Sequence, residues 1–360
     1  MKYLRIIYLI SALCFTVGCA DFMDIVPDDV ATLETAFTNR QNAEKFLFTC
    51  FSYLPNPVNI SECPALIGGD EIWWDIDVPG FETSSFAYMA KGLQNTNDPY
   101  MNYWDGGRNG KNLFTGIRDC NIFLENIHTP PDLEDYERDI WIAEVKFLKA
   151  YYHFYLLQLY GPIPIVRENL PVNALPEEVR IYREPVDYVI NYIVELIDEA
   201  TPQLPFKLVS QATDAGRITQ PIALALKAKV LTWAASPLLN NNPYYANVKD
   251  NRGVQLFPVG SVPDNVKWEK AAVALKNAID TCHLAGNALY TYEASAATEM
   301  SDETVMKYTI RGIVTQKFNS ETIWPSTYGT GSLQKYCMPK LGAYEYVGGI
   351  SEISATLKIA

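Results

Sequence analysis

The sequence has 360 residues, of which 48% are hydrophobic and 20% are charged, and its formal net charge is −13. The apolar content is ample for a large buried core, which excludes global disorder, and an acidic chain without a dense Lys/Arg run lacks the basic surface that a nucleic-acid-binding protein needs. The chain also holds 23 Tyr and 7 Trp, and aromatic rings that carry a polar group are suited to half-exposed binding surfaces as well as to cores.

The first residues have the pattern of an export signal. Lys2 and Arg5 precede an apolar run over residues 6–17, which is too short to span a membrane, and the run ends at Gly18-Cys19. A small residue directly before a cysteine at this point indicates a bacterial lipoprotein signal. We therefore predict that residues 1–18 are removed, that Cys19 is lipidated, and that residues 19–39 form a tether. The alternative is an ordinary export signal with an incidental cysteine.

Helical patterns dominate the chain after residue 40. The strongest covers residues 133–160, where apolar side chains recur every three or four residues on one face, and Gly161-Pro162 ends it. Similar patterns indicate further helices at 40–53, 110–127, 186–202, 222–239 and 268–282. The stripes that define the last three helices are Val186, Ile190, Ile193 and Ile197; an alanine-rich run; and Trp268, Ala272, Leu275, Ile279 and Cys282.

These helices occur in neighbouring pairs with small residues at the expected contacts. The pattern predicts an all-α fold in which helical pairs stack as in tetratricopeptide arrays, with an irregular helical domain as the alternative. Two stretches, at about 55–109 and 240–349, are rich in Gly, Pro and Asn and are predicted to be long loop insertions, which in compact proteins tend to carry function.

One segment of the first loop region suits carbohydrate binding. Residues 68–77 combine two adjacent tryptophans with several carboxylates in a glycine-flanked stretch. A sugar presents apolar C–H faces and hydroxyl groups, which a flat aromatic ring and planar acceptors can bind. A second aromatic cluster covers residues 324–328. The candidate ligand-binding residues are therefore Trp73, Trp74, Asp70, Asp75, Trp324 and Tyr328.

The same segment leaves two alternatives open. The tryptophan pair could have only a structural role and pack the loop against the helical core. The carboxylates could instead form a glycosidase pair, which would make the protein a lipid-anchored enzyme; the residues concerned are Asp70, Glu71, Asp75 and Asp77.

Other chemistry finds no support in the sequence. The three histidines, His128, His153 and His283, are far apart, and His153 is expected to pack or hydrogen-bond within its helix. No nucleophile motif, phosphate loop, metal-ligand spacing or cofactor motif is complete. Five cysteines remain after the signal, scattered and odd in number, so one disulfide is compatible with the sequence but cannot be paired from it.

Several segments resemble the SusD/RagB-type surface lipoproteins of Bacteroidetes. They are the lipidated start at Cys19, residues 116–127 (GIRDCNIFLENI), residues 143–166 (AEVKFLKAYYHFYLLQLYGPIPIV), residues 216–219 (GRIT) and residues 318–324 (FNSETIW). They occur in the family's order and span nearly the whole chain.

The resemblance implies an all-α, tetratricopeptide-like fold whose loops form a ligand surface, and no catalysis or cofactor. It implies a lipid-anchored protein on the outer-membrane surface that captures a glycan and delivers it to a SusC-like, TonB-dependent transporter. A relative that binds peptides or protein fragments is the alternative. Because family members are usually longer, it also implies that the C-terminal part of the family fold is missing after residue 360.

Overall fold

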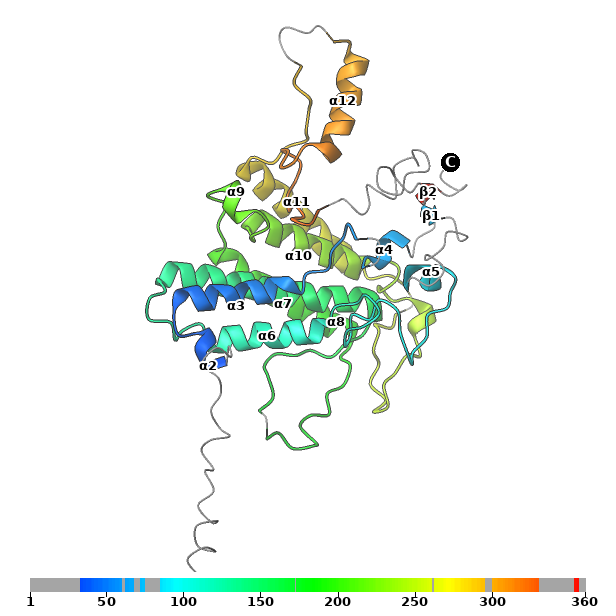
Figure 1. The fold of residues 1–360 in the computed structure, drawn as a ribbon. Coiled ribbons are helices and arrows are strands. Elements are labelled where there is room, and N and C mark those ends of the chain that lie inside the picture. The colour runs from blue at the N-terminus through cyan, green and yellow to red at the C-terminus, as the bar shows by residue number, and fades with distance from the viewer. Residues whose placement is uncertain are drawn as a thin grey trace, which may run out of the picture.

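The computed structural model describes residues 33–59, 62–67, 72–74, 85–171, 173–260, 262–294, 300–329 and 353–355. Helices dominate these residues (Figure 1). The α-helices are α2 (Leu33–Ala36), α3 (Arg40–Ser52), α4 (Pro64–Ile67), α5 (Ser85–Ala90), α6 (Leu113–Asn126), α7 (Asp135–Tyr160), α8 (Val186–Ala200), α9 (Gln211–Asp214), α10 (Gln220–Ala235), α11 (Asn265–Ala285) and α12 (Asp302–Thr315). Two short 3₁₀-helices, η2 (Thr201–Gln203) and η3 (Pro243–Tyr245), and two strands, β1 (Ile72–Trp74) and β2 (Ile353–Ala355), complete the set.

The long helices form a layered stack in which each packs mainly on its neighbours in the sequence. Helix α3 packs on α6 and α7, α6 on α7, α7 on α8, α8 on α10, and α10 on α11. The connections lie at alternate ends, so the helices run back and forth (Figure 1). This arrangement confirms the predicted all-α fold of stacked helical pairs.

The helix boundaries follow local signals that the sequence already contains. The side chain of Asn39 accepts a hydrogen bond from the backbone N–H of Asn42 at the start of α3, and Asn112 accepts one from Thr115 at the start of α6, both at 2.9 Å. Helix α7 ends at Gly161, whose positive φ of 68° is unfavourable for other residues. The predicted helices near 40–53, 110–127, 133–160, 186–202, 222–239 and 268–282 are therefore all confirmed.

Helix α7 is the centre of the core and is buried around most of its circumference. The predicted face is buried at Trp141, Val145, Leu148 and Tyr152, but the opposite side, which includes Phe147, is buried as well. A helix needs apolar residues all round when it is enclosed, and α7 is enclosed by α3, α6 and α8.

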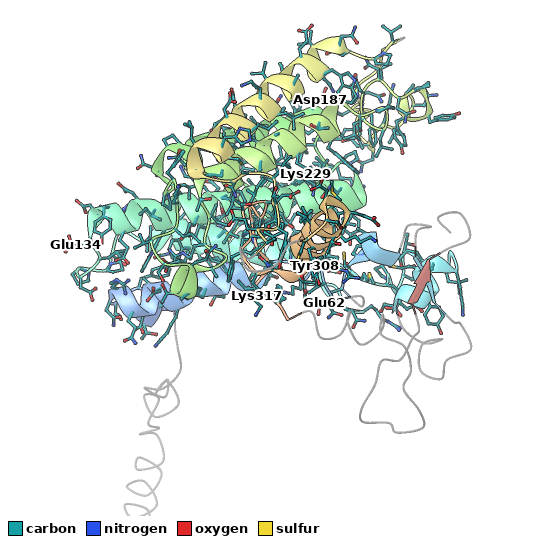
Figure 2. All side chains as sticks on the ribbon, turned by 90° about the horizontal axis from the view of Figure 1, so that it is seen from above. Glu62, Glu134, Asp187, Lys229, Tyr308 and Lys317 are labelled. Atoms are coloured by element: carbon teal, nitrogen blue, oxygen red, sulfur yellow. The ribbon has the colours of Figure 1, made fainter. Side chains whose placement is uncertain are left out.

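Helices α10 and α11 approach each other through small residues, as the alanine-rich pattern predicts. Ala228 of α10 packs with Ala274 and Ala278 of α11. The apolar stripe predicted on α11 is only partly used, since Leu275 and Ile279 remain 43% and 50% exposed. An ion pair also links α11 to α8, because Lys267 Nζ lies 2.6 Å from Asp187 Oδ1. Asp187 is labelled in Figure 2.

The stretches that the sequence predicts as loops contain, besides the predicted helix α11, the elements α4, β1, α5, η3 and α12. Helix α12 projects from the stack beyond α11 (Figure 1), and Gly312 is its only buried residue in the described part. Strand β1 pairs antiparallel with β2, with Trp73 opposite Ser354. This small sheet lies near α4 and α5 (Figure 1). Its strands come from distant parts of the chain.

Several predictions fall outside what the structure describes. Cys19, Asp70 and Asp75 lie outside the described residues, as do the side chains of Trp73 and Trp74, whose backbone forms β1. None of the helices in the described part of the chain is long and apolar enough to cross a bilayer.

Candidate functional site

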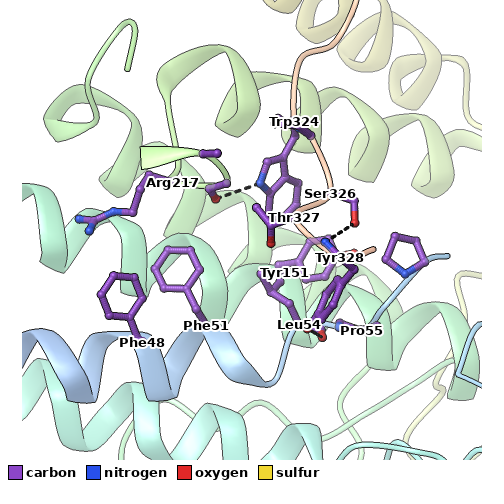
Figure 3. Close-up of a pocket in the computed structure, with 14 residues that line it drawn as sticks. Phe48, Phe51, Leu54, Pro55, Tyr151, Arg217, Trp324, Ser326, Thr327 and Tyr328 are labelled. Atoms are coloured by element: carbon purple, nitrogen blue, oxygen red, sulfur yellow. Dashed lines mark hydrogen bonds between the residues drawn. The ribbon is translucent and has the colours of Figure 1, made fainter. Parts of the chain in front are cut away.

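A cavity of about 250 Å³ opens between the C-terminal half of α3, helix α7 and the segment 324–328 (Figure 3). Its walls are predominantly apolar and aromatic. The lining residues are Phe48, Phe51, Leu54, Pro55, Pro57, Tyr151, Ala215, Gly216, Arg217, Trp324, Pro325, Ser326, Thr327 and Tyr328. We call this cavity the aromatic pocket.

Trp324 forms one wall of the aromatic pocket and is fixed by contacts with the helical core. Its indole ring meets Phe147 and Tyr151 edge to face, with ring centroids 5.5 and 5.4 Å apart. The indole N–H donates a hydrogen bond of 3.2 Å to the backbone oxygen of Gly216 (Figure 3). Because an edge-to-face cluster fixes the ring plane, the wall is preformed rather than assembled on binding.

The loop that accepts this hydrogen bond is anchored by a buried ion pair. Glu144 of α7 is 1% exposed, and its carboxylate accepts two hydrogen bonds from the Arg217 guanidinium, at 2.7 and 2.6 Å, and a third from the backbone N–H of Ile218. Burial raises the pKa of Glu144, and the positive charge of Arg217 together with these bonds opposes the rise. The bidentate geometry therefore holds residues 216–218 at a defined position above α7.

Gly216 is required by the same arrangement. Its φ of 90° lies in the left-handed region, and a Cβ at this position would stand 2.9 Å from Thr327 Cγ2. The absence of a side chain thus allows the loop and the segment 324–328 to pack directly against each other. This contact explains why a glycine directly precedes the anchored arginine.

Tyr328 closes the other side of the aromatic pocket. Its hydroxyl donates a hydrogen bond of 3.2 Å to the Leu54 backbone oxygen and accepts one of 3.3 Å from the Lys111 ammonium. Lys111 also donates to the backbone oxygens of Ser52 and Leu54 and lies 5.5 Å from the centre of the Tyr328 ring. One lysine therefore joins the end of α3 to the segment 324–328.

The aromatic pocket combines fixed walls with accessible ring surface. Phe48 is 50% exposed and Tyr328 37% exposed, whereas Tyr151 at the base is partly buried, and burial raises its pKa to about 12. The Tyr151 hydroxyl therefore stays protonated at physiological pH. Such a surface can pack against a flat apolar ligand face and offers hydroxyl and cationic groups at its rim.

The structure brings together two of the residues that the sequence analysis selected. Trp324 and Tyr328 both line the aromatic pocket. Their role in ligand binding stays a prediction, as do the roles of Asp70, Trp73, Trp74 and Asp75, which lie outside the described side chains. Sequence reasoning missed Phe48, Phe51, Tyr151 and Arg217. The aromatic side chains at 48 and 51, placed just before a run of prolines, were the available signal.

Comparisons with known proteins agree with this fold. Residues 81–231 match a family model described as "Starch-binding associating with outer membrane". The solved protein BT4246 is 25% identical to this chain, and the two structures superpose with a TM-score of 0.71. The match includes 89% of this chain and 56% of BT4246. The sequence of residues 81–231 and the fold of the chain are thus similar to those of SusD-like proteins.

Two further similar proteins have lower sequence identity. The SusD-like protein P25 of Formosa agariphila is 22% identical over 237 residues, which are 64% of this chain and 43% of P25. A laminarin-binding SusD-like protein has the same fold, with 18% sequence identity and a TM-score of 0.51. The match includes 80% of this chain and 51% of that protein. The chain thus spans about half the length of the relatives it matches.

Proposed function

We propose that this protein is a non-catalytic, SusD-like glycan-binding protein and that the aromatic pocket binds the apolar face of a sugar ring. The observation that carries the proposal is the preformed pocket itself, in which Phe48 and Tyr328 expose ring surface beside the fixed indole of Trp324. The description of the matching family as starch-binding supports this ligand class.

The experiment is a binding titration of the purified chain against a panel of neutral and acidic polysaccharides, by affinity electrophoresis and then calorimetry. The variant Phe48→Ala removes an exposed ring with little effect on the core, and we expect it to weaken binding of the recognised glycan about tenfold, equivalent to ~1.4 kcal/mol. Tyr328→Phe, which keeps the ring and removes the hydroxyl, is expected to weaken it less.

The matched control is Tyr244→Ala, because Tyr244 is 91% exposed and does not line the aromatic pocket. It should leave binding unchanged. Equal affinity in Phe48→Ala and the unaltered chain would place the ligand elsewhere. Binding of apolar peptides, with no glycan retained, would favour the peptide-binding alternative, and release of reducing ends from a bound glycan would favour a glycosidase.

We also propose that the protein is held at the outer-membrane surface by a lipid on Cys19 and delivers its ligand to a SusC-like transporter. The supporting observations are the signal pattern before Cys19 and the outer-membrane association in the family description. Replacement Cys19→Ser should move the chain from the membrane to the soluble fraction, since stable attachment depends on the acyl chains. Retention of this variant in the membrane fraction would contradict the proposed anchor.

A further inference from the structure

Two buried cysteines lie on neighbouring helices that pack against each other. Cys50 belongs to the last turn of α3 and Cys120 to the middle of α6, and both are 0% exposed. The two helices pack against each other. The structure holds both residues as free thiols.

The backbones of α3 and α6 approach closely at this level. Gly116, one turn before Cys120, has no side chain, and a Cβ there would lie 2.8 Å from the Tyr53 ring. Tyr53, three residues after Cys50, donates a hydrogen bond of 2.7 Å to the Asp119 carboxylate, next to Cys120. These contacts fix the register of the two helices beside the cysteines.

The two thiols also act directly on each other. The pKa of Cys50 is raised well above its ordinary value, first by a side-chain hydrogen bond with Cys120 and then by burial. In the folded chain Cys50 is therefore a poor nucleophile that would react only slowly with an external oxidant. Any bond between the two sulfurs would have to form while the chain folds, before the core closes.

We propose that Cys50 and Cys120 form a disulfide that joins α3 to α6 in the exported protein. The proposal rests on the proposed export and not on the proposed ligand, because disulfides persist in compartments outside the reducing cytosol. The sequence alone is compatible with one bridge but cannot choose the partners. Among the cysteines of the described residues, Cys50 and Cys120 lie on two helices that pack against each other. Cys63 instead precedes α4, and Cys282 lies on α11, which packs on α10.

The chemistry is a thiol–disulfide exchange with an oxidised dithiol carrier protein. One thiolate of the unfolded chain attacks a carrier sulfur and forms a mixed disulfide, and the second thiolate then displaces the carrier. The S–S bond of the carrier is broken, the Cys50–Cys120 bond is formed, and the carrier leaves with both electrons and both protons as a dithiol.

The test uses the full chain, recovered from exporting cells in denaturant that contains a thiol-alkylating reagent. A digest without reductant should contain one cross-linked peptide pair with Cys50 and Cys120, lighter by two hydrogens than the sum of the separate peptides. Cys63 and Cys282 should be alkylated. Reduction should lower the midpoint of thermal unfolding by at least about 5 °C, because the bond closes a long loop of the unfolded chain.

Two variants separate the bond from general effects of cysteine replacement. Cys120→Ala should leave Cys50 alkylated and make the unfolding midpoint insensitive to reductant, whereas Cys282→Ala should behave like the unaltered chain. A second measurement, refolding of the unaltered chain in a glutathione redox buffer, should yield the same cross-linked peptides. Alkylation of both Cys50 and Cys120 in the exported protein would overturn the proposal, whatever the refolded protein shows.

Discussion

His153 shows how a buried titratable residue is accommodated without any role in the aromatic pocket. It lies in α7 with 0% exposure, and its ring Nδ1 is 2.7 Å from the Lys149 backbone oxygen while Nε2 is 3.4 Å from the Val166 backbone nitrogen. These partners fit a neutral ring that donates through Nδ1 and accepts through Nε2. The expected packing and hydrogen-bonding role of His153 is thereby confirmed.

This environment makes the stability of the fold depend on pH. The pKa of His153 is lowered to about 4, first by burial and also by the positive charges of Lys149 and Arg167, while the bond to the Lys149 oxygen opposes the fall. Below pH 6.5 the unfolded chain therefore binds a proton that the native chain does not. Between pH 6.5 and 4 the native state should lose about 3 kcal/mol from this residue.

The measurement is urea unfolding of the unaltered chain and of His153→Gln at pH 7 and pH 4. Carboxylates titrate in both proteins, so only the difference between them reports on His153. We expect the unaltered chain to lose about 3 kcal/mol more than the variant over this range. Equal losses of unfolding free energy in the two proteins would show that His153 takes up its proton at the same pH in the native and the unfolded chain.

At the scale of the elements, α11 differs from the other long helices because its apolar residues are divided between two sides. The side toward α10 is built from Ala271, Ala274 and Ala278, whereas Leu275 and Ile279 on another side stay about half exposed. Periodicity alone could not decide which side would be buried, since small residues that allow close approach leave the larger side chains outside the contact.

Replacing the exposed pair should therefore affect self-association more than stability. We expect Leu275→Gln/Ile279→Gln to reduce binding of an apolar fluorescent dye and light scattering, because exposed apolar patches promote association. The free energy of unfolding should change by less than about 1 kcal/mol. Ala278→Gln is the control on the buried side, and overpacking should cost it about 1–3 kcal/mol. If the double variant lost as much unfolding free energy as Ala278→Gln, the side of α11 with Leu275 and Ile279 would be part of the core.

For the whole molecule, the sequence predicts what depends on near neighbours. Periodicity, caps and breakers within a few residues predict the end of α7 at Gly161 and the six stacked helices α3, α6, α7, α8, α10 and α11. The family resemblance adds the stacked architecture. Helix α12 was not predicted, because it lies in a stretch that the sequence predicts as a loop insertion and buries only Gly312 among the described residues.

The aromatic pocket was predicted only in part, because most of its residues are not near neighbours in the sequence. Trp324 and Tyr328 are close in the sequence and could be noticed as a cluster. Phe48, Tyr151 and Arg217 join them only through packing between segments that are far apart along the chain. The sequence offers no measure of such distances, and the Glu144–Arg217 bond that places the loop is likewise invisible before α7 and residues 216–218 are brought together.

The pairing of β1 with β2 bears on the order in which the chain folds. The helical layers contact mainly their sequence neighbours, so they can assemble progressively from one neighbour to the next. Strand β1 precedes the helices from α6 to α12 in the chain, whereas its partner Ile353–Ala355 follows them. The backbone of Trp73 and Trp74 therefore has no strand partner until the segments that form these helices have also been synthesised and exported.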